Sequence, residues 1–478
     1  MNNKPLHFVI VGGGTAGWMT ANLLAKKWQH LGVKITLVES PDVATIGVGE
    51  GSTPTLKRFF ELIGVAESQW MHRCNATYKL NIKFKGWSPK SNINAYSHPF
   101  TTQVDVFTSR AFHVNCRTRR LGLDTQTSPD KFLLNGVLAN QKKSPVTPDN
   151  FPLLGDFLSE HAIKQNVRHM KAHISDVKKN QSGEITALIT NKNERIEGDY
   201  FVDCTGFSSY LMQKTLGVKF KSFKDNLFND SAVVMQTPSG DVNLKETTST
   251  ALSNGWCWNI PLQNRQGNGY VFSADFITPE NAEIEFRQHI NALDSDQECR
   301  HLKMRVGQLE QHWINNCIGL GLSQGFIEPL EATALHLVQI SIEHFIYQFE
   351  SGGFTAKNRQ IYNQNISERF ERVRDYIVAH YKLNTREDSD YWRENRANNK
   401  LSDSLIQILD TWYKCDDLSE EISRQKLTTH FDATSWHCLF AGYGVFPPLK
   451  PNQPGKGDLY TEQNIEQFLQ GCSLNFRR

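Results

Sequence analysis

The stretch HFVIVGGGTAGW, residues His7–Trp18, determines how the rest of this 478-residue chain is interpreted. Its apolar run ends at Gly12, and residues compatible with a helix resume from Ala16, which predicts a buried strand, a glycine turn and a helix start. The glycines have the G-x-G-x-x-G spacing, in which backbone amides at the helix start face a pyrophosphate. The predicted cofactor-binding residues of this turn are Gly12, Gly14, Thr15, Ala16 and Gly17.

A second apolar run, residues 33–39, predicts the next parallel strand. Glu39 ends it and is placed to accept hydrogen bonds from ribose hydroxyls. A glycine turn without a ligand is the alternative interpretation of the first stretch alone. Strand, turn, helix, second strand and terminal acid together favour a Rossmann-like, doubly wound α/β fold that binds a dinucleotide.

Composition excludes several classes of partner. Lys and Arg total 52 against 50 for Asp and Glu, and a net charge of only +2 does not indicate binding to nucleic acid or to an anionic membrane. The nine cysteines are scattered, without a C-x-x-C pair or metal-ligand spacing, which is typical of reduced thiols in a cytoplasmic protein without a metal site. No signal peptide or membrane span is expected. The partner is therefore expected to be a small molecule.

Short strands separated by turn signals fill the segment from His173 to Asp203. A β-meander at this point, followed by Asp203 and Gly206, is the connection of flavin-binding doubly wound folds, in which such an Asp and Gly lie against the cofactor's sugar-phosphate chain. No second glycine fingerprint for a nicotinamide cofactor is present. The chain is therefore expected to bind flavin but not its own reductant.

Residues 79–85 alternate between apolar and polar side chains, which predicts an edge strand with a solvated face of lysines. Further on, residues 255–261 predict a strand on which Trp256 and Trp258 point to the same face. The two rings wall one cavity or form an aromatic pair in a core; the pattern leaves both open.

A long helix is predicted to start near Pro329 and to end at Gly352-Gly353. Glu331 falls in its first turn, where the helix dipole alone favours a carboxylate. The same helix start becomes an anion site if its unpaired amides point at the flavin ring. Its apolar stripe comprises Leu330, Ala334, Leu337, Val338, Phe345 and Phe349.

Over nearly its whole length the chain resembles the flavin-dependent halogenases of the tryptophan halogenase type. The resemblance includes the glycine turn at 12–18 and Lys79 after a helix containing Trp70-Met71. It also includes Trp-x-Trp-x-Ile-Pro at 256–261 and Phe-Ile-Glu-Pro-Leu-Glu at 326–331. The 256–261 hexapeptide is the most specific of these motifs.

The resemblance implies a reaction in which reduced FAD and O2 form a C4a-hydroperoxide that halide, chloride or bromide, converts to hypohalous acid. Lys79 matches the lysine that delivers this oxidant to an electron-rich aromatic carbon, and Glu331 the glutamate that polarises the oxidant and removes the ring proton. An ammonium makes hypohalite more electrophilic and a neutral amine can become a haloamine, so a buried lysine with a tunable pKa suits either version.

Further site residues follow from the same resemblance. Thr333 and Ala334 match the pair whose amides hold halide. Flavin contacts align with Gly51 and Leu322, and Trp256 and Trp258 are expected near the flavin, where they keep substrate away from the hydroperoxide. The loop that holds the aromatic ring matches His98 and Phe100.

Two regions depart from the family pattern. Ala332 stands where these halogenases usually have Ser, and Ala334 where they have Gly. The clamp that grips the amino acid part of tryptophan is not recognisable in residues 435–442. The expected substrate is therefore indole or another electron-rich, tryptophan-like arene, and the choice between these and free tryptophan stays open.

The expected architecture is α/β, with a flavin-monooxygenase-like FAD module, a β-meander, a substrate sheet and a mostly helical C-terminal region. The predicted division is 1–350, with the substrate sheet inserted at about 207–300, and 351–478 as a substrate cover. A separate NAD(P)H-dependent flavin reductase is the expected partner, and a homodimer stays open. The alternative functions are a flavin-dependent monooxygenase of the same fold, against which the two tryptophans argue, and a non-catalytic flavin-binding protein.

Overall fold

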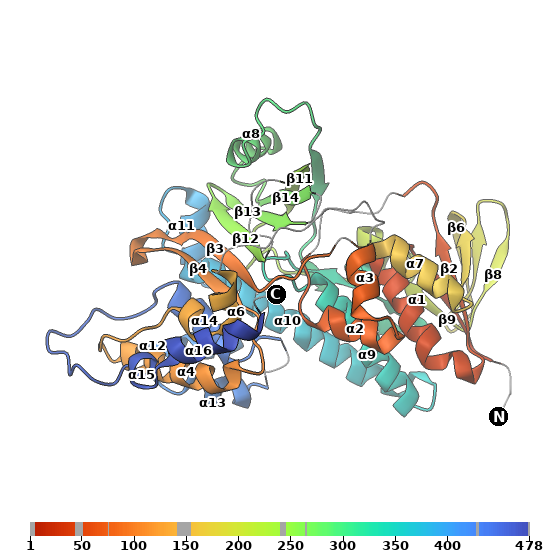
Figure 1. Cartoon of the computed structure of the whole chain (residues 1–478). Helices are drawn as coiled ribbons and strands as arrows, with labels where there is room; N and C mark the ends of the chain where they lie inside the picture. The colour runs from red at the N-terminus through yellow and green to blue at the C-terminus, as the bar shows by residue number, and fades with distance from the viewer. Residues whose placement is uncertain are drawn as a thin grey trace. The chain divides into compact units, whose positions relative to one another are not determined.

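The computed structural model describes residues 5–43, 51–74, 76–140, 154–239, 245–262, 265–426 and 430–476 (Figure 1). The chain forms two compact units, each assembled from three segments. Unit 1 comprises Met1–Ala76, Asp149–Lys224 and Met304–Glu371; unit 2 comprises Thr77–Pro148, Asp225–Lys303 and Arg372–Arg478. These are units of compactness, so the predicted functional division at residue 350 stays a prediction.

Unit 1 is built on a six-stranded sheet with the order β17-β18-β9-β1-β2-β5. All neighbouring pairs are parallel except the pair β17 and β18. The strands are β1 (His7–Val11), β2 (Lys34–Glu39), β5 (Arg168–Lys171), β9 (Tyr200–Asp203), β17 (Trp313–Ile314) and β18 (Cys317–Gly319). This confirms the predicted first two strands and the doubly wound α/β fold.

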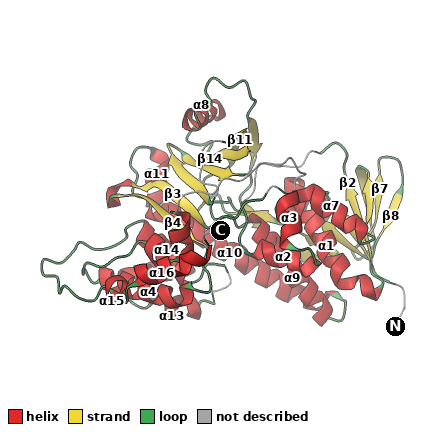
Figure 2. Cartoon of the chain, in the orientation of Figure 1, coloured by secondary structure: helices red, strands yellow, loops and turns green. Residues whose placement is uncertain are grey.

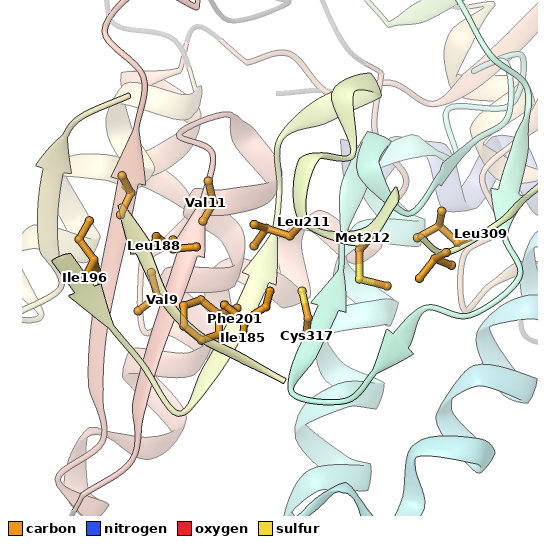
Figure 3. Packing of buried hydrophobic residues seen from close by; sticks show 12 residues of the cluster. Val9, Val11, Ile185, Leu188, Ile196, Phe201, Leu211, Met212, Leu309 and Cys317 are labelled. Atoms are coloured by element: carbon orange, nitrogen blue, oxygen red, sulfur yellow. The ribbon is translucent and has the colours of Figure 1, made fainter. Parts of the chain in front are cut away.

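The two faces of this sheet carry different layers. Alternate side chains of β1 point to opposite faces, and Phe8 packs its ring against Trp28 of helix α1 (Thr15–Trp28) and against Phe345 and Phe349 of helix α9 (Ala334–Ser351). On the other face, Val9 and its neighbours pack against the β-meander, as Figure 3 shows. The meander is β6 (Ile174–Lys179), β7 (Ile185–Thr190) and β8 (Arg195–Glu197), close to the predicted positions.

The remaining elements of unit 1 surround this sheet. The helices are α1 (Thr15–Trp28), α2 (Thr55–Ile63), α3 (Glu67–Arg73), α7 (Leu154–Lys164) and α9 (Ala334–Ser351). A small sheet has the order β10-β16-β19, formed by β10 (Phe220–Ser222), β16 (Gly307–Leu309) and β19 (Gly325–Phe326). Helix α10 (Arg359–Leu383) begins in unit 1 and ends in unit 2.

Unit 2 contains a seven-stranded sheet with the order β15-β11-β14-β13-β12-β3-β4. One face of β11, β13 and β14 packs against helix α8 through Ala282 and Phe286, and Figure 2 shows α8 beside these strands. The strands are β3 (Asn81–Ser88), β4 (Ile93–Pro99), β11 (Ser231–Pro238), β12 (Glu246–Leu252), β13 (Gly255–Pro261), β14 (Arg265–Phe272) and β15 (Arg300–Lys303). The predicted strand at 255–261 is thereby confirmed.

Helices fill the rest of unit 2. They are α4 (Asp105–Arg120), α5 (Pro129–Phe132), α6 (Leu134–Ala139), α8 (Pro279–His289), α11 (Asp390–Ala397), α12 (Asp403–Tyr413), α13 (Leu418–Arg424), α14 (Ala433–Gly442), α15 (Leu459–Glu462) and α16 (Ile465–Ser473). Among the described residues, no helix combines the length and the apolar character needed to cross a bilayer, and no group of three His, Cys, Asp or Glu side chains is arranged to hold a metal.

The predicted edge strand with a solvated lysine face is wrong in two respects. Strand β3 begins at Asn81 and lies between β12 and β4, so it is an internal strand. Asn81, on the face predicted to be solvated, is fully buried, and Lys83 pairs with Glu246 at 3.6 Å. The alternation was identified correctly, but of the second face Asn81 is buried, Lys83 is half-buried and Lys85 alone is exposed on this strand.

The predicted start of the long helix near Pro329 is also wrong. Helix α9 begins at Ala334, and Glu331 lies in the preceding turn, where the Ala332 amide donates to the Pro329 carbonyl at 3.1 Å. Ala332 has a φ of +54°, a left-handed conformation that interrupts helical geometry for a residue with a Cβ. Glu331 is therefore held by a turn rather than by the first turn of a helix.

Two histidines stack on each other inside the helical part of unit 2. The rings of His113 and His437 lie 4.0 Å apart at 14°. Burial lowers the pKa of His113 to about 4, against the opposing charges of Asp432 and Asp417. Burial, reinforced by His113, holds the pKa of His437 well below its usual range.

These histidines predict a loss of stability in acid. The unfolded chain binds protons on them below about pH 6.5, whereas the folded chain excludes those protons until the pH falls further. We expect the free energy of unfolding in urea to fall by about 2 kcal/mol for each of the two histidines between about pH 7 and about pH 5. His437→Phe, which keeps an aromatic ring without titrating, is expected to reduce this dependence by about half. An unchanged slope in that variant would assign the acid sensitivity to other groups.

Candidate active site

The glycine turn leaves an open space at one position only. Gly12 has a φ of +117°, and a Cβ there would lie 2.1 Å from the carbonyl oxygen of Cys204. At Gly17 a Cβ would meet the Gly12 carbonyl oxygen at 2.0 Å. By contrast, a Cβ on Gly14 would meet nothing within 4 Å. The first and third glycines therefore allow strand and helix to pack, while the second leaves room at the N-terminus of α1 for an approaching group.

Glu39 borders this turn. A Cβ on Gly13 would lie 2.4 Å from Glu39 Cδ, so the glutamate side chain passes directly over the turn. Its Oε2 lies 2.8 Å from His169 Nε2 on the neighbouring strand β5. This contact fixes one carboxylate oxygen beside the predicted ribose position.

Asp203 is tied to its own chain. It is fully buried, and its Oδ1 accepts hydrogen bonds from the Thr205 amide and hydroxyl at 3.0 and 2.6 Å. Its Oδ2 accepts from the amides of Leu211 and Met212, both at 2.8 Å. Because these four donors use the acceptor positions of the carboxylate, the geometry supports a role in holding the segment around Gly206 rather than in direct contact with a cofactor. At Gly206 itself, with a φ of +66°, a Cβ would meet nothing within 4 Å.

The segment at 319–329 lies beside the glycine turn. A Cβ on Gly321 would lie 2.6 Å from the Ala16 Cβ, which places the neighbouring half-buried Leu322 beside the start of α1. Gly51 lies close to the Glu331 turn, because a Cβ on Gly51 would be 3.2 Å from the Ala332 Cβ. Most of the glycine-containing stretch at 45–54 before and around Gly51 lies outside the described residues.

Glu331 and Thr333 are both buried, each with about 3% exposure. Thr333 is the N-cap residue of α9, and the Leu337 amide donates to its carbonyl at 2.9 Å. Its Oγ1 is buried and has no hydrogen-bond partner among the described residues. A buried hydroxyl without a partner beside the first amides of an 18-residue helix fits the predicted halide site at Thr333 and Ala334.

Lys79 lies in unit 2, just before β3. Its Nζ donates to Thr77 Oγ1 at 2.6 Å and to the Pro261 carbonyl at 2.5 Å. Burial lowers its pKa to about 7. A lysine with this pKa is present both as ammonium and as free amine near neutral pH, the condition expected of a lysine that handles an electrophilic oxidant.

The strand that ends at Pro261 also carries the predicted tryptophan pair. Trp256 and Trp258 point to the same face of β13, with ring centroids 6.1 Å apart, and both are buried. The Trp258 ring lies over Gly269 on β14, where a Cβ would be 2.2 Å from the indole. Its Nε1 has no hydrogen-bond partner within the described part of the chain, which fits a ring that lines a site.

His98 lies at the centre of an aromatic group in unit 2. Its ring is 6.0 Å from Tyr376 and 6.5 Å from Phe431, and its Nε2 lies 3.1 Å from Ser435 Oγ. Phe100 follows β4, and its amide donates to the Leu80 carbonyl at 2.9 Å. That bond places the ring-holding segment beside the residue that follows Lys79.

Comparison with known proteins identifies the family. The family model for tryptophan halogenase matches residues 7–454. The chain belongs to the tryptophan halogenase family. A 7-chloro-L-tryptophan 6-halogenase of Kutzneria sp. (strain 744) is 37% identical to this halogenase over an alignment of 437 residues, with 84% of each chain covered. The crystal structure of a tryptophan 6-halogenase from Streptomyces toxytricini has a TM-score of 0.84 at 33% identity, covering 98% of this chain and 97% of the other.

A more distant relative has a different type of substrate. The crystal structure of a lanthipeptide tryptophan 5-halogenase matches this halogenase with a TM-score of 0.83 at 25% identity, covering 98% of this chain and 92% of that one. Members of the family are flavin-dependent, and this halogenase uses FADH2, O2 and a halide. The open space at Gly14 and Gly206 fits the phosphate chain of FAD.

Sequence reasoning missed the partners of the halogenase's key side chains. Thr77 and the Pro261 carbonyl hold Lys79, and Tyr376, Phe431 and Ser435 surround His98. Thr77, two residues before Lys79, and Pro261, at the end of the hexapeptide, can both be found in the sequence. No pattern in the chain indicated that two segments 182 residues apart in sequence would bring Lys79 and Pro261 together.

Proposed function

We propose that this halogenase attaches chloride or bromide to an electron-rich aromatic carbon of an indole or tryptophan-like compound, with Lys79 and Glu331 as catalytic residues. When bound, reduced FAD supplies, with O2, the oxidising power that converts halide to hypohalous acid. The observation that carries the proposal is the buried Lys79 amine, held against Pro261 at the end of the tryptophan-bearing strand, with a pKa of about 7.

Each proposed role follows from the chemistry of its side chain. Thr333 and Ala334, at the N-terminus of α9, bind the halide through backbone amides, where the helix dipole favours an anion. Lys79 hydrogen-bonds or captures hypohalous acid and presents its electrophilic halogen to the ring. Glu331 removes the proton from the halogenated ring carbon, as a general base does. Trp256 and Trp258 exclude the organic substrate from the flavin.

The proposal for the substrate concerns its aromatic ring and not the rest of the compound. His98 and Phe100 hold this ring, and the Phe431 ring, 6.5 Å from His98, is one of the aromatic side chains beside them. The relatives act on different carbons and on both free and peptide tryptophan, by their names. Which ring carbon this chain halogenates therefore depends on the loops around its own substrate site.

The test is halogenation by the purified protein with FAD, a separate NAD(P)H-dependent flavin reductase, NADH and air. Indole, tryptophan and a tryptophan-containing peptide are supplied with equal chloride and bromide, and products are analysed by mass spectrometry. A halogen isotope pattern that requires halide supports the proposal. An oxygenated product that forms equally without halide, or reduction of FAD by NADH without the reductase, would favour the monooxygenase instead.

Glu331→Gln tests the proposed base. The amide keeps the shape of the side chain but does not accept the ring proton, so we expect the turnover number to fall by about 100-fold while FAD affinity is unchanged. Product formation is followed by chromatography, with Glu343→Gln, a partly exposed carboxylate on α9, as the control. Full activity of Glu331→Gln would remove Glu331 from the mechanism.

A further inference from the structure

Three atoms around Lys79 form a closed hydrogen-bonded triangle. Lys79 Nζ donates to Thr77 Oγ1 at 2.6 Å and to the Pro261 carbonyl oxygen at 2.5 Å, and Thr77 Oγ1 donates to the same carbonyl at 3.1 Å. A carbonyl oxygen has two lone pairs, so it accepts from both groups at once. All three residues belong to unit 2.

We propose that Thr77 is a positioning residue that, together with the Pro261 carbonyl, fixes Lys79 Nζ so that hypohalous acid is transferred to the aromatic substrate instead of escaping. This inference rests on the proposed function of Lys79. Thr77 itself touches neither substrate nor cofactor in this account.

The physical need for such a residue follows from the lysine side chain. Its ammonium is a point charge on a four-carbon stem with several rotatable bonds, and a displacement of about 1 Å is enough to cost much of a rate that depends on orientation. One acceptor restricts Nζ to an arc around that acceptor. Two acceptors, themselves joined by a hydrogen bond, define one position and one rotation about the terminal C–N bond.

The triangle works for both protonation states of Lys79. The ammonium donates two of its N–H groups to Thr77 Oγ1 and the Pro261 carbonyl, and the neutral amine donates both of its N–H groups to the same two acceptors. Either form of Lys79 is therefore held at the same position.

Thr77 can be changed without removing the neighbouring backbone contacts. The Leu80 amide donates to the Lys245 carbonyl at 2.8 Å, and the Phe100 amide donates to the Leu80 carbonyl at 2.9 Å. Neither bond uses the Thr77 side chain. Thr77→Val keeps the branched shape and removes only the hydroxyl, and Thr77→Ser keeps the hydroxyl and removes only a methyl group.

The experiment measures how hypobromous acid is divided between bromination of the substrate and escape into solution. With reductase, FAD, NADH, bromide and indole, bromoindole is quantified by chromatography, and escaping hypobromous acid is trapped with monochlorodimedone. We expect Thr77→Val to lower the turnover number for bromoindole by about 10-fold or more, with an unchanged KM for indole and more trapped oxidant. Thr77→Ser is expected to return the ratio of bromoindole to trapped hypobromous acid to within about 2-fold of wild type. Thr247→Val, a half-buried threonine on β12, is the matched control.

Each outcome decides a different statement. A wild-type ratio in Thr77→Val, or equal impairment in Thr77→Ser, overturns the positioning role while the halogenase function stands. If the wild type forms no bromoindole, the proposed function fails instead. The triangle is then tested by the rate at which limiting acetic anhydride modifies Lys79, with exposed Lys85 as an internal reference; an identical rate in Thr77→Val would count against it.

Discussion

Replacing Lys79 with alanine is expected to lower halogenated product by at least about 100-fold while leaving FAD binding intact. In the proposed mechanism Lys79 supplies the N–H donors or the lone pair that activates hypohalous acid, and no alanine atom substitutes for either. Mass spectrometry of indole reactions measures the product, and fluorescence titration measures FAD. Free oxidant trapped by monochlorodimedone is expected to persist, because Lys79 acts after the oxidant has formed.

The matched control for Lys79 is Lys85→Ala, a nearby lysine that lies on β3 and is exposed to solvent. It is expected to retain wild-type activity. The pH dependence gives a second check, because the pKa of Lys79 is lowered to about 7 by burial. If the rate of product formation rises as the pH is raised through about 7, the free amine of Lys79 is the active form; if the rate falls, the ammonium is the active form. If Lys79→Ala keeps its activity, the mechanism proposed here is wrong.

The fold was predictable where the signal is local. The run from His7 to Trp18 shows strand, turn and helix because hydrophobic period and glycine spacing both depend on neighbouring residues. The meander and the strand at 255–261 follow from the same kind of pattern. Trp256 and Trp258 share a face because side chains two apart on any strand do so.

The errors arose where distant segments decide the outcome. The lysine face of residues 79–85 looks solvated, yet Asn81 bonds to Glu246 and Lys79 to Pro261, both more than 160 residues away. Burial of Lys79, and with it the lowered pKa, follows from those contacts. Likewise, no helix propensity predicts that Ala332 adopts a left-handed conformation and delays α9 to Ala334.

The two glycines of the turn are expected to fail in different ways when changed to alanine. In Gly12→Ala the new Cβ would lie 2.1 Å from the Cys204 carbonyl oxygen at a φ of +117°, so strand β1 and β9 must separate locally. We expect the free energy of unfolding to fall by about 3 kcal/mol or more, and FAD binding to be lost with it. Urea denaturation without FAD measures the first effect.

Gly14→Ala is expected to spare the fold and impair the ligand. Gly14 has a φ of −74° and a ψ of 178°, which any residue adopts, and its Cβ would enter open space at the start of α1. The stability of the FAD-free protein should change by no more than about 1 kcal/mol, the cost of alanine at a helix N-cap. FAD affinity should fall by about 10-fold or more, because the methyl group occupies the space through which the pyrophosphate reaches the helix amides. Unimpaired FAD binding in Gly14→Ala would place the phosphate chain elsewhere, whereas equal destabilisation in both variants would mean that the space at Gly14 has a structural purpose.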